Sequence, residues 1–377
     1  MNRARMVGMT GLASAMLALS LQAPATAADQ VTLSAADKVT LTAADKVTLG
    51  DVQQAMENVA KTAGVVGAIG EVYADGKRVG QGTAGSRLLD GKGGRIPPTS
   101  RYRIASQTKL MEATVILQLV GEGKLKLDDK LSAVLPEMAE RDYVDRADEI
   151  TVQQLIRHTS GIPDFMESGK FDVFDFTTAY KLIDLVKAAR TVPRKGEPGQ
   201  YLYSTTNYVL LGMIIEKLTG HDRATELKRR LFSPLGMKHT YLATKVSDQI
   251  KGPHGHGYYP DAKGRPRDVD RLNATIGAQG VISTAHDLSA YYRALNQGKL
   301  LPADLQRQMP RPFPELCGGT VSSASGSMPG ISSTTFSSTD GRIQFAVAAT
   351  LKIDNEQAMA VGDAVTQAAK AVLCPGQ

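Results

Sequence analysis

Several motifs that would assign a function directly are missing from this chain of 377 residues. It has no Gly-x-Ser-x-Gly motif, so nothing supports the α/β-hydrolase mechanism. It has no His-Glu-x-x-His motif, and its Lys and Arg residues form no cluster with interleaved aromatics of the kind that binds nucleic acid. No apolar run has the length that a confident membrane span requires. The chain therefore gives no sign of a zinc peptidase, a nucleic-acid-binding protein or an integral membrane protein.

An excess of one charge is also missing, because 44 basic residues face 38 acidic ones, for a net charge of +6. Residues 1–27 combine a basic start, an apolar stretch and small residues before a cleavage point, which is the pattern of a secretory signal peptide. Its removal takes away Arg3 and Arg5, which leaves 42 basic against 38 acidic residues, or +4. We therefore expect a secreted, extracellular protein, with an uncleaved anchor as the alternative.

Cysteine is rare, with Cys317 and Cys374 as its two occurrences. Both lie in the C-terminal part of a chain that we expect to be exported, and thiols are oxidised outside the cytosol. We therefore predict a disulfide between them, with two free thiols as the alternative.

The chain after the signal peptide divides into a linker and a domain. An eight-residue repeat fills most of residues 28–50, and three such short units are too few for a core of their own. Residues 51–377 are predicted to form the domain. Its hydrophobic patterns predict, in order, a helix at 52–63, a hairpin of strands 65–72 and 77–85, a strand at 343–351 and a helix at 355–373.

The order of these elements predicts the fold class. Segments 51–105 and 310–377 carry the strand signals, whereas residues from about 125 to 300 show mainly helical periods. Terminal strands around a helical insertion predict an α+β fold, with an antiparallel sheet flanked by helices and a mostly helical second region. We expect the active site in the cleft between the two regions.

The most informative feature is the tetrapeptide Ser-Gln-Thr-Lys at 106–109, which precedes a long apolar stretch. On a helix, residues three apart face one another, so Ser106 and Lys109 form a candidate nucleophile and proton acceptor. The first turn of a helix also presents unpaired N–H groups that stabilise a nearby oxyanion. A lysine acts as a base only where burial or neighbouring cations favour its neutral form. The alternative is a helix-capping serine followed by an exposed lysine.

Further segments strengthen the catalytic interpretation. They lie at 119–128 (Leu-Val-Gly-Glu-Gly-Lys-Leu-Lys-Leu-Asp), 150–161, 203–212 and 280–288. Ordered after the Ser-x-x-Lys motif, they make the chain from about residue 52 resemble the serine β-lactamase and penicillin-binding protein superfamily. The resemblance is greatest to the secreted D-alanyl-D-alanine carboxypeptidases of actinomycetes. It implies the β-lactamase/transpeptidase-like fold for this domain.

The resemblance also identifies a second catalytic element, Tyr-x-Asn. Its tyrosine corresponds to Tyr203, which would share proton transfer with Ser106 and Lys109. The position of the substrate-binding asparagine is held by Thr205, which has a hydroxyl but lacks the paired donor and acceptor of an amide. Asn207 lies nearby, but the family often has an asparagine there as well, so we assign it no role.

The third family element is a His-Thr-Gly or Lys-Thr-Gly triplet on a strand that lines the cleft. The corresponding residues are Ala324, Ser325 and Gly326, so the basic residue is missing. By the resemblance, Ser325 and Gly326 contribute to substrate binding, and the N–H of Ser327 joins that of Ser106 in an oxyanion hole. The arginine that grips the substrate carboxylate in close relatives has no evident equivalent between Met309 and Cys317.

Two histidine-containing segments are set aside. The His-Thr-Ser-Gly sequence at 158–161 looks like the missing triplet but lies where the family has a structural loop. His254 and His256 share a glycine-rich loop without a metalloprotease motif, and we expect them to be solvated. No metal and no cofactor is predicted.

The resemblance implies a serine hydrolase that acts through an acyl-enzyme on D-Ala-D-Ala peptides of peptidoglycan. D-amino-acid amides, esters and β-lactams are alternative substrates for the same residues. The losses at Thr205 and Ala324 leave open a different class of function, a degenerate protein that binds cell-wall peptide or penicillin without turnover. We expect a monomer whose partners are small substrates, without nucleic acid or an integral membrane partner.

Overall fold

The computed structural model describes residues 49–375, apart from 262, 278–279, 311–312 and 353–357. The predicted signal peptide and the linker up to residue 48 lie outside the described residues. In the described part, no helix combines the length and the apolar character needed to cross a bilayer.

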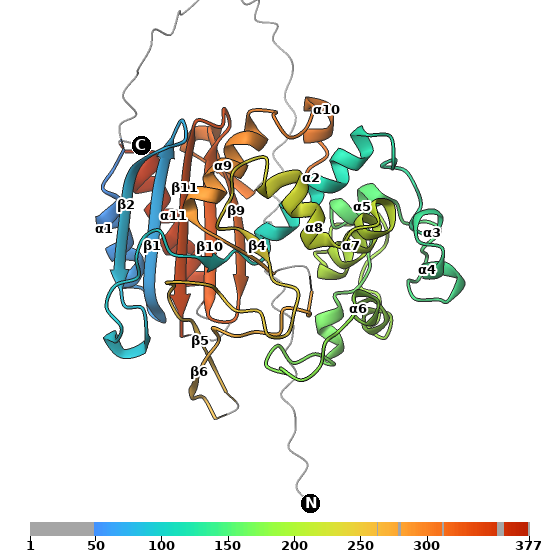
Figure 1. Ribbon diagram of the computed structural model, residues 1–377, viewed down its shortest axis with the longest axis horizontal. Helices are drawn as coiled ribbons and strands as arrows, with labels where there is room; N and C mark the ends of the chain where they lie inside the picture. Colours follow the sequence, from blue (N-terminus) through green and yellow to red (C-terminus); the bar gives the residue numbers. More distant parts are fainter. Residues whose placement is uncertain (1–48, 262, 278–279, 311–312, 353–357, 376–377) are drawn as a thin grey trace, which may run out of the picture.

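A six-stranded antiparallel sheet forms one half of the molecule (Figure 1). Its strand order is β2-β1-β11-β10-β9-β8. The strands comprise β1 (Val65–Ala74), β2 (Lys77–Gly85), β8 (Phe313–Leu316), β9 (Val321–Met328), β10 (Ile331–Ser338) and β11 (Ile343–Leu351). N-terminal and C-terminal segments therefore meet in one sheet, and the predicted α+β architecture, hairpin and final strand are confirmed.

Helices cover both faces of this sheet. On one face, α1 (Val52–Ala60) packs against α11 (Ala358–Leu373) and against β2. Helix α1 begins where the Asp51 side chain accepts a hydrogen bond from the N–H of Gln54, and its apolar residues recur at helical spacing on the buried side. On the other face lie α2 (Gln107–Gly121) and α9 (Ala285–Asn296), which contact β9 and β10–β11 respectively.

The second half is mostly helical, as expected (Figure 1). It includes α3 (Leu131–Val134), α4 (Glu137–Glu140), α5 (Val152–Ile156), α6 (Leu182–Ala189), α7 (Thr205–Thr219), α8 (Arg223–Leu227) and α10 (Ala303–Gln306). Single turns of other helix types occur at Leu89–Gly91, Phe165–Ser168, Lys228–Phe232 and Cys317–Gly319. Helix α2 belongs to both halves, because it packs against α7 and α8 as well as against β9.

Two small sheets were not predicted from the sequence. One joins β3 (Tyr102–Arg103), β7 (Val281–Ser283) and β4 (Tyr241–Leu242), and the other pairs β5 (Tyr258–Pro260) with β6 (Pro266–Asp268). Strands of two or three residues are too short for a period of two to be visible in a sequence. The β3–β7 pair fixes the chain directly before α2.

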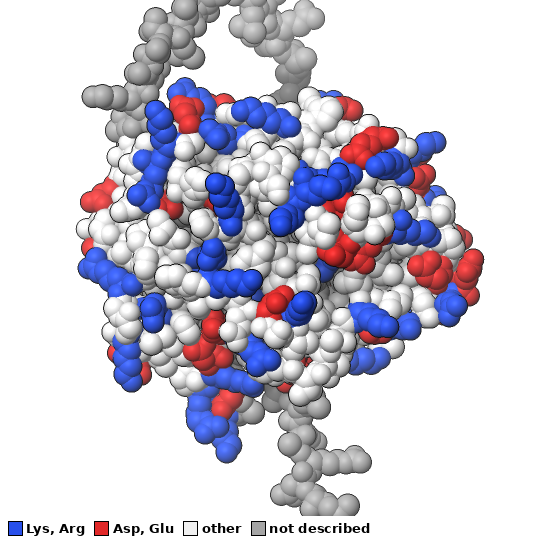
Figure 2. All heavy atoms as spheres, viewed as in Figure 1, with Lys and Arg blue, Asp and Glu red and all other residues white. Residues whose placement is uncertain are grey.

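The predicted disulfide between Cys317 and Cys374 is confirmed. It links the turn before β9 to the end of α11, so the strand that approaches the site is tied to the C-terminal helix. Basic and acidic side chains are interspersed over the face shown in Figure 2, in keeping with the mild net charge.

Candidate active site

Hydrogen bonds to β10 and to α9 hold the start of α2 in place. The Gln107 side chain donates to Ser333 Oγ at 2.9 Å and accepts hydrogen bonds from Tyr292 and Thr335, also at 2.9 Å. Directly before the nucleophile candidate, Ala105 has a φ of +47°, a left-handed conformation that non-glycine residues rarely adopt. Backbone strain of this kind often accompanies functional sites. The turn between β3 and α2 is thus bent sharply and anchored to the sheet.

Ser106 lies at this turn, directly before the first residue of α2, and its side chain forms no capping hydrogen bond. Its Oγ is 2.8 Å from Tyr203 Oη and 3.5 Å from Lys109 Nζ. Lys109 Nζ also lies 5.2 Å from the centroid of the Tyr203 ring. The structure therefore brings the three residues predicted to be catalytic together. Ser106 occupies the N-cap position of α2 without a capping hydrogen bond, and Lys109 is buried, so the alternative of a capping serine with an exposed lysine does not hold.

Lys109 is almost completely buried, with 3% of its surface exposed. One turn further along α2, the buried carboxylate of Glu112 pairs with Arg223 at 2.9 Å. Burial raises the pKa of Glu112 to about 7, although the charges of Arg223 and Lys109 lower it. Sequence reasoning missed this ion pair, which lies directly behind the candidate base.

The position of Tyr203, two residues before α7, depends on His158. The imidazole stacks on the Tyr203 ring with centroids 4.4 Å apart, and its Nδ1 accepts a hydrogen bond of 3.1 Å from the N–H of Ser204. We set the His-Thr-Ser-Gly segment aside as a structural loop, but the structure shows that its histidine supports the candidate catalytic tyrosine. His158 has a φ of +55°, so the loop is also strained at this residue.

Burial and the charge of Lys109 lower the pKa of His158 to about 3, so the ring is neutral at neutral pH. In the unfolded chain its pKa would be about 6.5, and between pH 3 and 6.5 unfolding then takes up a proton. The contribution of neutral His158 to the free energy of unfolding is therefore fully present above pH 6.5 and is lost as the pH falls towards 3. Asparagine tolerates a left-handed φ, so His158→Asn is a suitable substitution. As the pH falls through this window, the free energy of unfolding of the variant should decrease by up to about 1.4 kcal/mol less per pH unit than that of the unmodified protein.

Urea unfolding at pH 7, 5.5 and 4.5 measures this difference. His221→Asn provides the same substitution at an exposed histidine, because the His221 side chain is 53% exposed, and comparison of the two slopes isolates the effect of burying His158. An unchanged slope for His158→Asn would show that His158 is not the buried neutral group described.

Thr205 is the first residue of α7 and is buried. Its N–H donates to the carboxylate of Asp164 at 2.7 Å, which stabilises the positive end of the helix. Asn207 is also buried, and its Oδ1 accepts a hydrogen bond of 2.6 Å from Ser160. Asn207 therefore has a structural partner in the core, which agrees with leaving it without a role.

Strand β9 passes very close to Ser106. A Cβ atom at Gly326 would lie 2.2 Å from the carbonyl oxygen of Ile104 and 2.7 Å from the backbone nitrogen of Ser106. A larger residue would therefore push β9 away from the nucleophile. Ser325 forms a 3.1 Å hydrogen bond with Thr334 of β10, and Ser327, half-buried, follows Gly326 directly.

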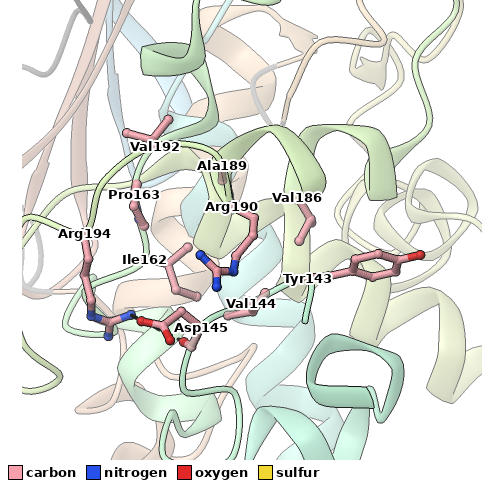
Figure 3. Close-up of a pocket in the computed structure, with 10 residues that line it drawn as sticks. All are labelled: Tyr143, Val144, Asp145, Ile162, Pro163, Val186, Ala189, Arg190, Val192 and Arg194. Atoms are coloured by element: carbon pink, nitrogen blue, oxygen red, sulfur yellow. Dashed lines mark hydrogen bonds and ion pairs between the residues drawn. The ribbon is translucent and has the colours of Figure 1, made fainter. Parts of the chain in front are cut away.

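A separate pocket lies in the helical half (Figure 3). It is lined by Tyr143, Val144, Asp145, Ile162, Pro163, Val186, Ala189, Arg190, Val192 and Arg194. Its two guanidinium groups have carboxylate partners, since Arg190 pairs with Asp142 at 2.9 Å and Arg194 lies 3.7 Å from Asp145. None of the predicted catalytic residues lines this pocket, so we do not assign it to the chemistry.

Comparison with known proteins identifies the family and the fold. The family model described as Beta-lactamase matches residues 52–326. Penicillin-binding protein 4 from Amycolatopsis lactamdurans is 31% identical over 234 residues, which are 61% of this chain and 59% of that protein. The match thus spans less than two thirds of the length of this relative.

Two solved structures share the fold. A D-stereospecific amidohydrolase from Streptomyces sp. is 29% identical, with a TM-score of 0.70 over 82% of this chain and 96% of that one. A D-amino acid amidase from Ochrobactrum anthropi SV3 is 23% identical, with a TM-score of 0.71 over 85% and 96%. At that identity the second likeness concerns the fold alone.

Proposed function

Because this chain belongs to the β-lactamase family of serine hydrolases, we propose that Ser106, Lys109 and Tyr203 perform acyl transfer. The single observation that carries this proposal is the contact of Ser106 Oγ with Tyr203 Oη at 2.8 Å and with Lys109 Nζ at 3.5 Å. A hydroxyl becomes nucleophilic when a neighbouring group accepts its proton, and both neighbours are within reach of that proton.

In the proposed reaction, Ser106 Oγ forms a bond to the substrate carbonyl carbon. Its proton passes through Tyr203 and Lys109 to the leaving group as the bond to that group breaks. The backbone N–H groups of Ser106 and Ser327 stabilise the oxyanion. Water then attacks the acyl-enzyme, and its proton returns through the same residues to Ser106. The close approach of Gly326 to the Ser106 nitrogen supports a joint oxyanion hole.

The substrate class that we propose is neutral amides or esters of D-amino acids. A buried substrate carboxylate needs a cationic partner, and the family position for a basic residue on β9 is occupied by Ala324, which is buried. Thr205 in place of asparagine reduces the capacity to hold a peptide amide. The amidohydrolase that is 29% identical to this chain is named for D-stereospecific amide hydrolysis, which supports the same substrate class.

A second candidate is D-Ala-D-Ala carboxypeptidase activity on peptidoglycan peptides. The ordered motifs from Ser106 to Gly326 and the relative named as a penicillin-binding protein favour it. Binding of β-lactams or cell-wall peptide without turnover would use the same site. We further propose that the protein is secreted and acts as a monomer on small substrates, and the Cys317–Cys374 disulfide supports export.

The substrate proposal predicts a preference that can be changed. The unmodified enzyme should have a higher kcat/KM for D-amino-acid amides and esters than for D-Ala-D-Ala peptides with a free carboxylate. The double variant Thr205→Asn/Ala324→His should shift the ratio at least roughly 10-fold towards the peptides, because a charged hydrogen bond contributes about 1.5–3 kcal/mol. Steady-state kinetics on matched substrate pairs measures this ratio.

The matched control is Ser322→Asn, a substitution on the same strand but four residues before Gly326, which should leave the ratio unchanged. A preference of the unmodified enzyme for the free-carboxylate peptide would contradict the proposal. It would show that a cation outside the family positions reaches the substrate.

A further inference from the structure

His254, His256, Asp268 and Asp270 form a cluster outside the site described above. A ring nitrogen of each histidine and a carboxylate oxygen of Asp270 all lie within 4.8 Å of one another. The imidazoles stack with centroids 4.9 Å apart, and their side chains are only 11% and 22% exposed. The expectation that these histidines are solvated is therefore wrong.

The β5–β6 hairpin creates this cluster. Tyr258 pairs with Asp268 in the antiparallel ladder, and the N–H of Val269 donates to the carbonyl of Gly257 beyond it. The chain before β5 thus runs beside the chain after β6. Alternate residues of an extended chain point to the same side, so His254 and His256 face Asp268 and Asp270. The sequence signal is a His-x-His and an Asp-x-Asp on either side of a hairpin.

Hydrogen bonds fix the orientation of both rings. His254 Nδ1 lies 2.6 Å from the carbonyl of Gly252, and its Nε2 lies 2.7 Å from Asp270 Oδ1. His256 Nδ1 lies 2.8 Å from Asp268 Oδ2. With Gly252 and Asp268 each accepting from Nδ1, the Nε2 atom of each ring is left to bind an ion, and His254 Nε2 must first release the proton that it shares with Asp270. A carbonyl or carboxylate that orients a histidine through its other nitrogen is a regular feature of metal sites.

The backbone around the cluster is also well anchored. The N–H of His256 donates to the carbonyl of Arg87 at 2.9 Å, and Arg103 Nη2 donates to the carbonyl of Asp270 at 2.9 Å. Gly257 packs so closely on the β9–β10 turn that a Cβ would lie 2.0 Å from the carbonyl oxygen of Gly330. The side chains are therefore held on a rigid support, which lowers the cost of ordering them around an ion.

From this arrangement we propose a binding site for a divalent transition metal, with zinc as the expected ion, made of His254, His256 and Asp270. The ligands would be Nε2 of each histidine and Oδ1 of Asp270, with water completing a tetrahedral shell. Ligand atoms about 2.1 Å from a tetrahedral ion are roughly 3.4 Å from one another. Binding would therefore lengthen the distance between His254 Nε2 and Asp270 Oδ1 and shorten the distances from His256 to these two atoms.

The donor set and the charge select the kind of ion. Imidazole nitrogens suit zinc, copper and nickel, whereas magnesium and calcium prefer shells of oxygen alone. The carboxylates of Asp268 and Asp270 supply the negative charge that a divalent cation requires. The ion would clamp the segments on either side of the β5–β6 hairpin to each other, a stabilising role that goes beyond the proposed acyl transfer.

Metal titration of the purified full chain, prepared without a histidine tag and stripped with a chelator, tests the proposal. We expect a single Zn²⁺ per chain by calorimetry, a rise in the thermal midpoint with added zinc, and visible absorption of a Co²⁺-loaded sample without a thiolate band. The last expectation follows because both cysteines form the disulfide. Absence of stoichiometric binding would overturn the site.

Variants locate the ion. His254→Asn, His256→Asn and the conservative Asp270→Asn should each raise the zinc Kd at least about tenfold, and Asp268→Asn should raise it through the orientation of His256. His221→Asn is the matched control and should bind zinc like the unmodified protein. Retention of full affinity in the three ligand variants would place the ion elsewhere and refute the assignment.

Discussion

Replacement of Ser106 by alanine is expected to lower kcat for any amide or ester substrate by at least about 10⁴-fold. The nucleophile makes the covalent bond in the proposed reaction, and loss of one member of such a unit removes most of its effect. The fold should not change, because the Ser106 side chain forms no capping bond to α2. Initial rates on a D-amino-acid ester and circular dichroism of the same sample measure both expectations.

Ser322→Ala is the matched control for this substitution. Ser322 lies near the start of β9, four residues before Gly326, and its hydroxyl makes a long hydrogen bond of 3.4 Å to the carbonyl of Ser337. This variant should retain nearly full activity. If Ser106→Ala kept activity within about tenfold of the unmodified enzyme, another nucleophile would have to be sought.

Lys109→Ala and Tyr203→Phe should each lower the rate of acylation by roughly 10³-fold, whereas the double variant should be only slightly slower than either one. Both residues contact the same hydroxyl and handle the same proton, so removal of the first leaves little for the second to do. Stopped-flow acylation by an activated ester gives the three rates.

Suitable controls for this pair are Lys124→Ala, beyond the end of α2, and Tyr201→Phe, an exposed tyrosine two residues from Tyr203. Both should leave acylation nearly unchanged. Independent, multiplying effects of Lys109→Ala and Tyr203→Phe would show that the two residues act in separate steps.

The sheet was predictable because its signals are local. Residues 345–349 of β11 form a continuous apolar run that is buried on both faces, and the β1–β2 hairpin is marked by the Asp-Gly turn at 75–76. The disulfide followed from the number and location of the cysteines. The helix after Ser106 was also predictable from a local signal, its long apolar stretch. In the structure these apolar residues are buried on nearly every side of the helix.

The site residues that belong to a sequence motif were predictable. The residues that reach the site only through contacts between distant segments were not. The motifs identified Ser106, Lys109 and Tyr203, which the structure brings together. No local pattern shows that His158 stacks on Tyr203, because a loop and a helix start meet only after folding.

The same limit applies to the buried Glu112–Arg223 pair, which joins α2 to α8, and to the contact of the two histidines before β5 with Asp270 after β6. In each case the two contacting residues lie on different segments of the chain, and the identity of one residue does not predict which residue it contacts. Spacing within one helix is fixed by its geometry, whereas spacing between elements is fixed by the packing of the core.

The identity of the acylated residue shows most directly whether Ser106 is the nucleophile. The full chain should be incubated with an activated ester and, separately, with a penicillin, quenched in acid, and examined by intact mass and by peptide mapping. We predict one acyl group per chain, on the peptide that contains Ser106, and no adduct in Ser106→Ala. An adduct that persists in that variant, or that maps to another residue, would contradict the assignment of Ser106 as the nucleophile.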